Sequence, residues 1–473
     1  MNLSARPTIP APLDLGFLPA VLYNRSYAAA AKASGQAVPL VIGLERECGL
    51  LSRFETVVKS NAAADTLRYV ERIVKFLLWA RGGWKLHVGG PKAIGEFIRK
   101  TYSAKGARKF DCEMMEKSYG KKFQVVVTSA GKVPANKEMQ IAAGGHLKGC
   151  RIGFDLGASD YKISAVVDGE AIFTEETPWL PTKAANPEYL YHHISSALHR
   201  AAANLPHVDA IGGSSAGIIV DSEIRVASLL RSIPKKDFPK AAAVFKRIQK
   251  EWNVPVVVMN DGDVTALAGA LSLRQKAILG IAMGSSEAVG FMDKQGRILG
   301  WLNELAFAPV DYNPAAPADE WSGDRGVGAL YFSQQAVNKL LPAAGITLPK
   351  EMGLPERLKE VQNLMAKGNT RAAKIYETIG VYFGYAIAHY ADFYDVRHLL
   401  ILGRVTTGKG GDILLAKARE VLKREFPEVA AQIELHVPDE ASRRIGQAVA
   451  AASLPPVKNS LSARLTWANA ALI

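Results

Sequence analysis

The chain has 473 residues, of which 48% are hydrophobic and 22% charged, and this composition indicates a globular protein rather than a disordered or fibrous one. No apolar run approaches the roughly 18 residues that cross a bilayer, and the Pro-rich start lacks the order of a secretory signal, so a cytoplasmic location is expected. The three cysteines, Cys48, Cys112 and Cys150, lie far apart, which excludes a CxxC zinc site and a disulfide framework.

The net charge of +13 is concentrated in the first third of the chain. Residues 1–150 contain 23 Lys and Arg against 11 Asp and Glu, a net charge of +12. Such asymmetry can mark a nucleic-acid or membrane surface. The basic residues alternate with apolar ones, however, so a solvated basic face or attraction for an anionic substrate explains them equally well. A nucleic-acid partner is left open but not favoured, and no membrane partner is expected.

The first third of the chain divides into an irregular arm with one short helix, residues 1–36, and a basic α/β region, residues 37–149. Periodicity and breakers predict strands and helices in alternation, at 38–44, 65–80, 84–88, 92–102 and 123–128. A helix followed by a strand and Gly-Gly occurs at 66–90 and again at 189–213. The basic region is therefore either a degenerate copy of the later unit or a chance likeness to it.

The remaining chain is expected to form two lobes, 150–270 and 271–455, and a C-terminal tail, 456–473. Predicted strands lie at 151–156, 161–167, 170–174, 208–212, 255–259, 277–283, 288–292 and 398–402. Predicted helices lie between them at 189–203, 264–271, 370–394 and 412–424. Strands joined by helical crossovers, in two successive groups, predict an α/β fold in two lobes.

The first motif that carries chemistry is F-D-L-G-A-S-D-Y-K, residues 154–162. An apolar strand ends at Asp155, a turn of small residues follows, and the chain returns as a second strand. Such a turn brings backbone N–H groups and a hydroxyl to phosphate oxygens, and Asp155 can hold a magnesium ion through water. By itself the motif is equally compatible with an ordinary hairpin that has an aspartate in its turn.

The second motif is V-V-V-M-N-D-G-D, residues 256–263. Its apolar strand delivers Asn260 and Asp261 to the carboxyl end, where ligands collect in open α/β sheets. A carboxylate there can accept a hydroxyl proton during phosphoryl transfer, which makes Asp261 the candidate general base. The alternative is that the Asn-Asp pair caps the following helix, and the two roles are compatible.

Two further glycine-rich segments complete the set. Residues 281–290, I-A-M-G-S-S-E-A-V-G, place Gly284, Ser285 and Ser286 in a turn between two strands. Residues 400–411, L-I-L-G-R-V-T-T-G-K-G-G, run from a buried strand through a Gly-rich loop into a helix, which lets the backbone approach a nucleotide.

In chain order, these four segments resemble the phosphate 1, connecting, phosphate 2 and adenosine elements of the actin–Hsp70–sugar kinase superfamily, and within it the ROK (repressor, ORF, kinase) family. The family pattern DxGGTxxK resembles residues 155–162, NDAN…AL resembles 260–267, GTGxGxG resembles 284–290, and GExGHxPV resembles 303–310. The resemblance covers about two thirds of the chain, and the order of the motifs is more specific than any one of them.

The resemblance implies a two-lobed actin-like ATPase (ribonuclease H-like) fold with an additional N-terminal α/β region. It also implies ATP- and Mg²⁺-dependent phosphorylation of a hydroxyl on a sugar or sugar-like molecule, by a protein that forms a homodimer. Asp261 would be the base, and Asp155 would govern Mg²⁺ through water. The residues expected at the substrate are Asn260, Glu304, Ser214, Ser215 and Asp311. Those expected at the nucleotide and its phosphates are Asp155, Gly157, Ser159, Lys162, Gly284, Ser285, Ser286, Gly403 and Arg404.

The chain departs from the family pattern around the sugar pocket. Phe307 stands in place of the family's histidine, Ala329 in place of a sugar-binding glutamate, and Asp160 where asparagine is common. The zinc loop CxCGxxGC is replaced by residues 311–328, which contain no cysteine or histidine, so no zinc is expected there. That segment either supplies new polar ligands to a carbohydrate or is a loop stabilised by its own Asx turns and prolines; its candidate ligands are Asp311, Asn313, Asp319, Glu320, Trp321 and Asp324.

Two alternatives to a kinase remain. One is a non-catalytic ROK-type transcriptional regulator that senses a sugar, since such proteins carry an N-terminal winged helix-turn-helix. Residues 1–150 alternate strand and helix instead of forming a compact three-helix run, which weighs against a transcriptional regulator.

The other alternative is an inactive kinase-like protein. His192, His193 and His199 share no acidic partner, so a helix-surface role is favoured over a metal site.

Overall fold

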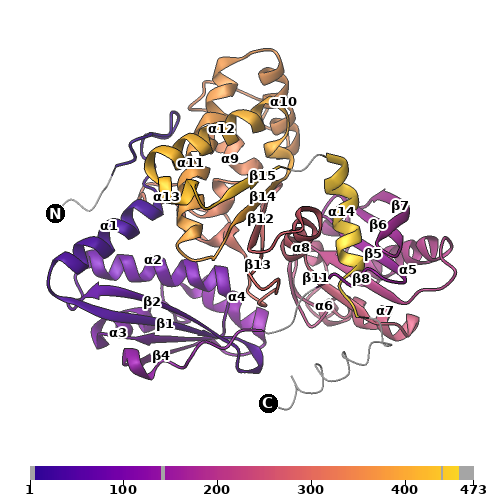
Figure 1. Cartoon of the computed structure of the whole chain (residues 1–473), viewed down its shortest axis with the longest axis horizontal. Coiled ribbons are helices and arrows are strands. Elements are labelled where there is room, and N and C mark those ends of the chain that lie inside the picture. Colours follow the sequence, from indigo (N-terminus) through magenta and orange to yellow (C-terminus); the bar gives the residue numbers. More distant parts are fainter. Residues whose placement is uncertain (1–5, 140–143, 438–439, 457–473) are drawn as a thin grey trace. The chain divides into compact units, whose positions relative to one another are not determined.

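The computed structural model describes residues 6–139, 144–437 and 440–456 of a mixed α/β protein (Figure 1). Its residues group into two compact units. Unit 1 comprises Met1–Met139, Ile281–Ala288 and Gly300–His436, and unit 2 comprises Gln140–Gly280, Val289–Leu299 and Val437–Ile473. Among the described residues, no helix combines the length and the apolarity needed to cross a bilayer. The predicted α/β class is confirmed.

The N-terminal part of unit 1 is a four-stranded sheet with helices packed on it. The strands run in the order β2-β1-β3-β4, where β1 is antiparallel to β2 and β3, and β3 is parallel to β4. They are β1 (Ala37–Glu45), β2 (Leu51–Lys59), β3 (Lys85–Gly89) and β4 (Gln124–Thr128). The helices are α1 (Ala20–Ala33), α2 (Ala64–Arg81), α3 (Lys92–Thr101) and α4 (Lys109–Tyr119), with short 3₁₀ turns η1 (Glu47–Gly49) and η2 (Ala130–Lys132).

Helix α2 is the buried centre of this region. Most of its side chains are inaccessible, and Phe76 and Trp79 have no exposed surface. The helix has Asp65 in its first turn, where a negative charge complements the helix dipole. It ends at Gly82, whose positive φ of 72° favours glycine.

The rest of unit 1 is mainly helical around one further sheet. Its elements are η5 (Leu305–Phe307), η6 (Gly328–Leu330), α9 (Gln334–Leu340), α10 (Leu354–Ala366), α11 (Thr370–Ala391), β14 (His398–Leu402), η7 (Arg404–Thr406), α12 (Gly408–Glu425), α13 (Pro427–Ala430) and β15 (Glu434–His436). Strands β12 (Ile278–Met283) and β13 (Glu287–Met292), which cross the unit boundary, join them in the order β13-β12-β14-β15. Gly380 and Gly384 of α11 let α12 approach closely, because an added Cβ would meet Leu414 O at 2.4 Å and the Val421 side chain at 2.5 Å.

Unit 2 is built on a five-stranded sheet of order β11-β8-β5-β6-β7. Strands β5, β8 and β11 are parallel, and β6 and β7 are antiparallel to their neighbours. The strands are β5 (Cys150–Leu156), β6 (Asp160–Val167), β7 (Glu170–Pro178), β8 (Ala210–Ser215) and β11 (Val256–Asn260), with a β9 (Ile218–Val220) and β10 (Glu223–Val226) hairpin beside them. The helices are η3 (Pro181–Lys183), α5 (Tyr189–Ala202), η4 (Ser228–Leu230), α6 (Phe238–Ala242), α7 (Val244–Trp252), α8 (Asp261–Leu273) and α14 (Glu440–Ala452).

Helix α14 lies against β5 and β8, as Figure 1 shows (yellow). Gly153 and Gly212 make this possible, because a Cβ would lie 1.9 Å from Ala448 O at the first and 1.6 Å from Ala451 O at the second.

Each unit combines segments that are separate in the sequence. The N-terminal third shares unit 1 with residues 300–436, and α14, expected in the second lobe, packs on the sheet of unit 2. The echo between the N-terminal region and unit 2 does not extend to strand pairing, since β3 is antiparallel to β1 whereas β8 is parallel to β5. Of the tail expected at 456–473, residues 457–473 lie outside the described residues.

Candidate functional site

Three parallel strands of unit 2 have their carboxyl ends side by side at one end of the sheet, and each carries polar side chains there. The register aligns Asp155 on β5 with Ser214 on β8, and Ser215 on β8 with Asn260 on β11. Asp261 follows directly as the first residue of α8. Because the carboxyl ends of parallel strands share one edge, buried apolar strands bring these groups together, as the two motifs predicted.

Asp155 is nearly buried, and its carboxylate is held on two sides. Ser214 Oγ donates a hydrogen bond of 2.7 Å to Oδ1, and Lys162 Nζ lies 4.0 Å from Oδ2. Lys162 reaches it because the two residues are partners in the antiparallel β5–β6 ladder. Burial raises the pKa of Asp155, and the charge of Lys162 and the Ser214 hydrogen bond oppose that rise. The carboxylate is therefore oriented at the edge of the sheet by neighbours that favour its ionised form.

Asp261 sits at the N-terminus of α8 with its side chain partly buried. Its Oδ1 accepts a hydrogen bond of 3.0 Å from the Gly262 N–H. Burial and, after it, the negative charge of Asp155 raise the pKa of Asp261 to about 6. At neutral pH the carboxylate is thus mostly ionised, yet its proton affinity is high for an aspartate, as a general base requires.

Asn260 uses both ends of its amide within the protein. Its Oδ1 accepts from the Gly262 N–H at 2.7 Å, which caps α8, and its Nδ2 donates to Gly217 O at 2.8 Å. The capping role is confirmed, while a substrate contact by Asn260 stays a prediction. Gln447 of α14 also contacts the first turn of α8, where its amide donates to Thr265 Oγ1 at 3.0 Å and to Asp261 O at 3.4 Å.

The turn after β5 is compact and internally bonded. The Gly157 N–H donates to Asp160 O at 3.0 Å, and Ser159 Oγ donates to Asp160 Oδ2 at 2.8 Å. Trp179 braces the turn through its indole N–H, which donates to Gly157 O at 2.8 Å. Lys162 Nζ, 3.4 Å from Asp160, stands between two carboxylates and offsets part of their charge.

Residues 281–288 of the third motif and the whole fourth motif belong to unit 1, whereas Asp155 and Asp261 belong to unit 2. Gly284 opens the turn after β12, where its N–H donates to Ser286 O at 3.0 Å, and Ser285 lies between them. Gly403 ends β14 with φ of 100°, and a Cβ there would lie 2.3 Å from Met283 O. The backbones of the two motifs therefore meet, at a position that accepts only glycine. The next residue, Arg404, accepts a hydrogen bond from Gln362 on its carbonyl.

The predicted sugar ligands Glu304 and Asp311 are positioned by the N-terminal part of unit 1. The Glu304 N–H donates to Trp79 O at 3.0 Å, at the carboxyl end of α2. Asp311 is buried, and its oxygens accept hydrogen bonds from the Leu18 N–H at 2.9 Å and the Tyr331 hydroxyl at 2.6 Å. Burial raises the pKa of Asp311 to about 6. These contacts favour a structural role for Asp311, and its contact with substrate stays a prediction.

Loop 311–328 is tied to α2 and α4 by a buried ionic network. Asp324 accepts from Arg108 at 2.8 Å and Arg72 at 3.1 Å, and lies 3.4 Å from Lys75. Lys75, which has no exposed surface, also pairs with Asp111 at 2.6 Å. Within the loop, Asp319 Oδ2 accepts from the N–H groups of residues 321 and 322, so the Asx-turn alternative is confirmed at that point.

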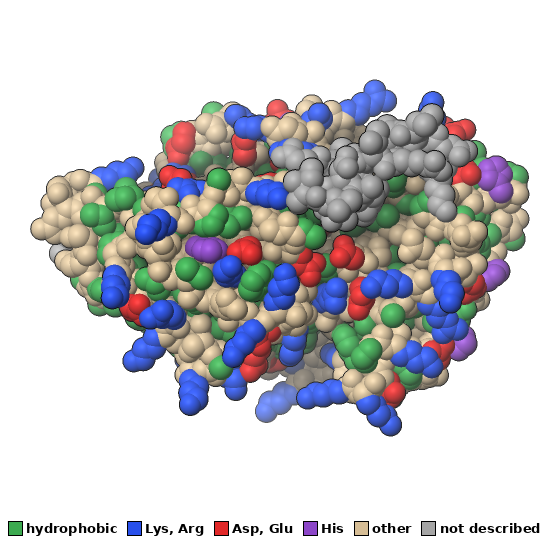
Figure 2. All heavy atoms as spheres, turned by 90° about the horizontal axis from the view of Figure 1, so that it is seen from below, with side chains coloured by type: hydrophobic (Ala, Val, Ile, Leu, Met, Phe, Trp, Pro, Cys, Tyr) green, Lys and Arg blue, Asp and Glu red, His purple; other side chains and the backbone are tan. Residues whose placement is uncertain are grey.

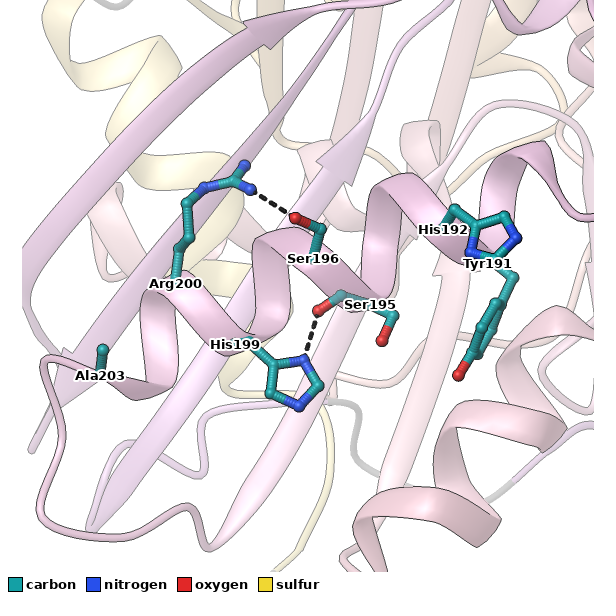
Figure 3. A pocket seen from close by; sticks show the side chains of 7 residues that line it. All are labelled: Tyr191, His192, Ser195, Ser196, His199, Arg200 and Ala203. Carbon is teal, nitrogen blue, oxygen red and sulfur yellow. Dashed lines mark hydrogen bonds between the residues drawn. The ribbon is translucent and has the colours of Figure 1, made fainter.

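An open groove runs along one face of α5 (Figure 3). Its lining residues come from this helix and from the residue that caps its carboxyl end: Tyr191, His192, Ser195, Ser196, His199, Arg200 and Ala203. His199 Nδ1 lies 2.8 Å from Ser195 O, and Arg200 donates to Ser196 Oγ at 2.8 Å. The groove is a surface feature of this helix, and neither Asp155 nor Asp261 is among its lining residues.

Comparison with known proteins gives matches of structure only. No family model and no curated protein matches the sequence. Among solved structures, a ROK family transcriptional regulator, described as a homolog of the E. coli MLC protein, superposes with a TM-score of 0.53 and 19% identity, over 64% of this chain and 78% of that one. A ROK family glucokinase from Streptomyces griseus, in complex with glucose and AMPPNP, superposes with a TM-score of 0.50 and 17% identity, over 64% of this chain and 99% of that one.

The chain shares the fold of the ROK proteins. The fold that the sequence resemblance implied is therefore confirmed, and membership of the ROK family stays a prediction. Sugar kinases and a transcriptional regulator are both built on the ROK fold, so the fold by itself does not choose between them.

Sequence motifs located Asp155 and Asp261, but they gave no signal for the Lys75–Asp111 pair or for Gln447, which depend on tertiary contacts.

Proposed function

We propose that the protein is a kinase that transfers the γ-phosphoryl group of ATP to a hydroxyl of a sugar or sugar-like molecule. One observation carries this proposal: Asp155 and Asp261 stand at the same sheet edge, close enough for the charge of Asp155 to raise the pKa of Asp261. A carboxylate poised to accept a proton beside a second, oriented carboxylate is what phosphoryl transfer to an alcohol needs.

In the proposed reaction, Asp261 accepts the proton of the acceptor hydroxyl as its oxygen bonds to the γ-phosphorus. The bond from that phosphorus to the bridging oxygen breaks, and ADP leaves. Asp155 would hold Mg²⁺ through water, and the ion when bound would neutralise phosphate charge. Its fit is supported by the Asp155 carboxylate, which Ser214 orients through one oxygen only. Ser159 would exchange its hydrogen bond to Asp160 for one to a phosphate oxygen, and Lys162 limits the repulsion from Asp155 and Asp160.

Among the expected substrate residues, we infer different roles. Ser214 orients Asp155, and Asn260 fixes the start of α8, so both position the carboxylates. Ser215 has no exposed surface and its hydroxyl donates to Ala216 O at 3.5 Å, so a contact with the acceptor would require the acceptor to enter beside β8.

The test is the Asp261→Asn variant of the full chain, assayed by coupled ADP detection over a panel of sugars and amino sugars. We expect kcat to fall by about 10²- to 10⁴-fold, the usual contribution of a general base, while nucleotide affinity stays near the wild-type value. Asp221→Asn, at an exposed turn, is the matched control and should retain full activity. Near-normal turnover by Asp261→Asn, or ADP release that no acceptor stimulates, would refute the assignment.

A regulatory function is the second candidate, because one of the two structures above is a transcriptional regulator and the N-terminal third is basic. Several of its cations are engaged internally, among them Arg72, Lys75 and Arg108. On the face in Figure 2, Lys and Arg are spread among Asp and Glu instead of gathering in one patch. Salt-dependent binding of the full chain to duplex DNA, together with sugar binding without turnover, would favour the regulator.

A further inference from the structure

Two histidines and a glutamate converge on the edge of the β14–β15 pair in unit 1. The two strands are parallel, with His398 opposite Glu434 and Leu400 opposite His436. Because side chains alternate between faces along a strand, residues 434 and 436 project on the same side, and His398 shares that side with its partner Glu434. The pairing of a three-residue strand with β14 thus sets three ligand-type side chains together.

Their ligand atoms form a nearly equilateral triangle. His398 Nδ1 lies 3.1 Å from His436 Nε2, and Glu434 Oε2 lies 3.5 Å from the first nitrogen and 3.6 Å from the second. The imidazoles are largely covered, with side-chain exposures of 13% for His398 and 24% for His436, whereas Glu434 is 72% exposed. The nitrogens therefore converge in a sheltered position, with the carboxylate closing the triangle from the solvent side.

This triangle has the size of one face of a metal coordination shell. Bonds of about 2.0–2.2 Å from zinc to nitrogen and oxygen in a tetrahedral site place neighbouring ligand atoms about 3.4 Å apart. A point about 2.0 Å from all three atoms exists in this arrangement, which is the distance that such bonds require. Two imidazoles and one carboxylate suit zinc and its first-row neighbours, while Mg²⁺ and Ca²⁺ prefer oxygen ligands alone.

We propose that His398, Glu434 and His436 bind a divalent transition-metal ion of the zinc class, with a fourth position open to water. The ion would cross-link β15, the short edge strand, to β14. His436 is also the last residue of unit 1 before the chain continues into unit 2. The site is separate from loop 311–328, where the family's zinc motif is absent, and it does not depend on the proposed kinase activity.

The competing explanation is a hydrogen bond between two neutral imidazoles, in which one ring nitrogen donates to the other. The full chain, freed of metal by chelation and dialysis, distinguishes the two. We expect titration with Zn²⁺ to give one tight site per chain by calorimetry and by metal analysis after gel filtration. Co²⁺ in the same site should give the visible absorption of four-coordinate cobalt.

The variants His398→Ala and His436→Ala should lose this site. Glu434→Gln, at a side chain that is 72% exposed, should leave folding intact and weaken Zn²⁺ binding at least about tenfold, since even outer partners of metal ligands contribute that much. His207→Ala is the matched control, because His207 belongs to the other described cluster of ligand-type residues, with Cys150 and Asp209. It should retain the site. Absence of stoichiometric Zn²⁺ binding in the wild type, or binding that is equal in wild type, His436→Ala and Glu434→Gln, would overturn the proposal.

Discussion

At the scale of single residues, the charge state of Asp261 sets how the proposed reaction responds to pH. Burial and Asp155 raise its pKa to about 6, whereas an ordinary aspartate titrates near 3.8. A base must be ionised to accept a proton, so kcat/KM should fall by about tenfold per pH unit below pH 6 and level off above it. Initial rates from pH 4.5 to 8, with enzyme preincubated at each pH to exclude inactivation, test this. An acid limb near pH 4 would contradict it.

Glu287 is a second buried carboxyl group, placed directly after the Gly-Ser-Ser turn. Tyr390 donates to its Oε1 at 3.1 Å, and no described residue offers Oε2 a hydrogen bond. Burial raises the pKa of Glu287 to about 8, with Glu304 adding to the rise. Glu287 is therefore protonated at neutral pH in the folded chain and ionised in the unfolded one.

This difference makes stability depend on pH in a defined direction. A folded pKa above the unfolded value of 4.5 contributes stability that is complete below pH 4.5 and is lost as pH rises to about 8. The loss is about 1.4 kcal/mol of unfolding free energy per pH unit in that window. Glu287→Gln, which keeps the shape and removes the proton, should flatten the decline in Tm between pH 6.5 and 8. The exposed control Glu113→Gln should keep the wild-type slope.

The sequence allowed the position of some polar residues to be predicted, but not the role of those that are buried by tertiary contacts. Asp155 and Asp261 could be predicted from the sequence, because each lies at the carboxyl end of an apolar strand, next to a turn or a helix start. Asp311 was also predicted to bind substrate. Its carboxylate oxygens accept hydrogen bonds from Leu18 and Tyr331, which are distant in sequence, so this arrangement could not be foreseen. The role of a polar residue depends on which groups the tertiary structure places beside it, and the local sequence pattern does not contain that information.

At the scale of elements, the α2–α4 contact with loop 311–328 carries a buried charge network. Lys75→Met leaves Asp111 and Asp324 without this cation, and removing one partner of a buried pair costs about 3–5 kcal/mol. We expect a large drop in the chemical denaturation midpoint. Lys109→Ala, which breaks an exposed pair with Glu113, should change the free energy of unfolding by less than about 1 kcal/mol. Equal effects of the two substitutions would show that the network is not what holds the loop.

Most helices and strands could be predicted from hydrophobic period and breakers, and the misses have physical causes. Strand β2 contains Arg53 and Glu55, because it lies at an edge of its sheet and is exposed on one side, so its apolar signal is weak. Strand β15 has three residues, too few for any periodicity, and it exists because β14 offers a free edge. Phe307 stands where the family pattern has a histidine. Its ring centroid lies 4.5 Å from that of Trp79, a contact that depends on tertiary structure.

At the scale of the whole molecule, residues 1–139 are a structural part of unit 1. The carbonyls of α2 receive the N–H groups of residues 303 and 304, and Arg46 and Trp301 both donate to Glu138. A chain cut to residues 140–473 should therefore fold poorly, with Asn303 and Glu304 unsupported. We expect it to expose apolar surface, measured by dye binding, and to lose the part of the cooperative thermal transition that belongs to unit 1. A soluble, cooperatively folding 140–473 fragment would contradict this.

The interleaved composition of unit 1 also bears on how the protein is made. Residues 1–139 leave the ribosome before residues 300–436, and the segment that completes their packing ends at His436. At about 5–20 residues per second, the intervening synthesis takes about 15–60 s, during which helix α2 lacks its later neighbours. Side chains such as Phe76 and Trp79, fully covered in the finished protein, are uncovered on their outer side for that interval. Nascent chains of this protein should therefore depend on holdase chaperones until translation reaches the end of the unit.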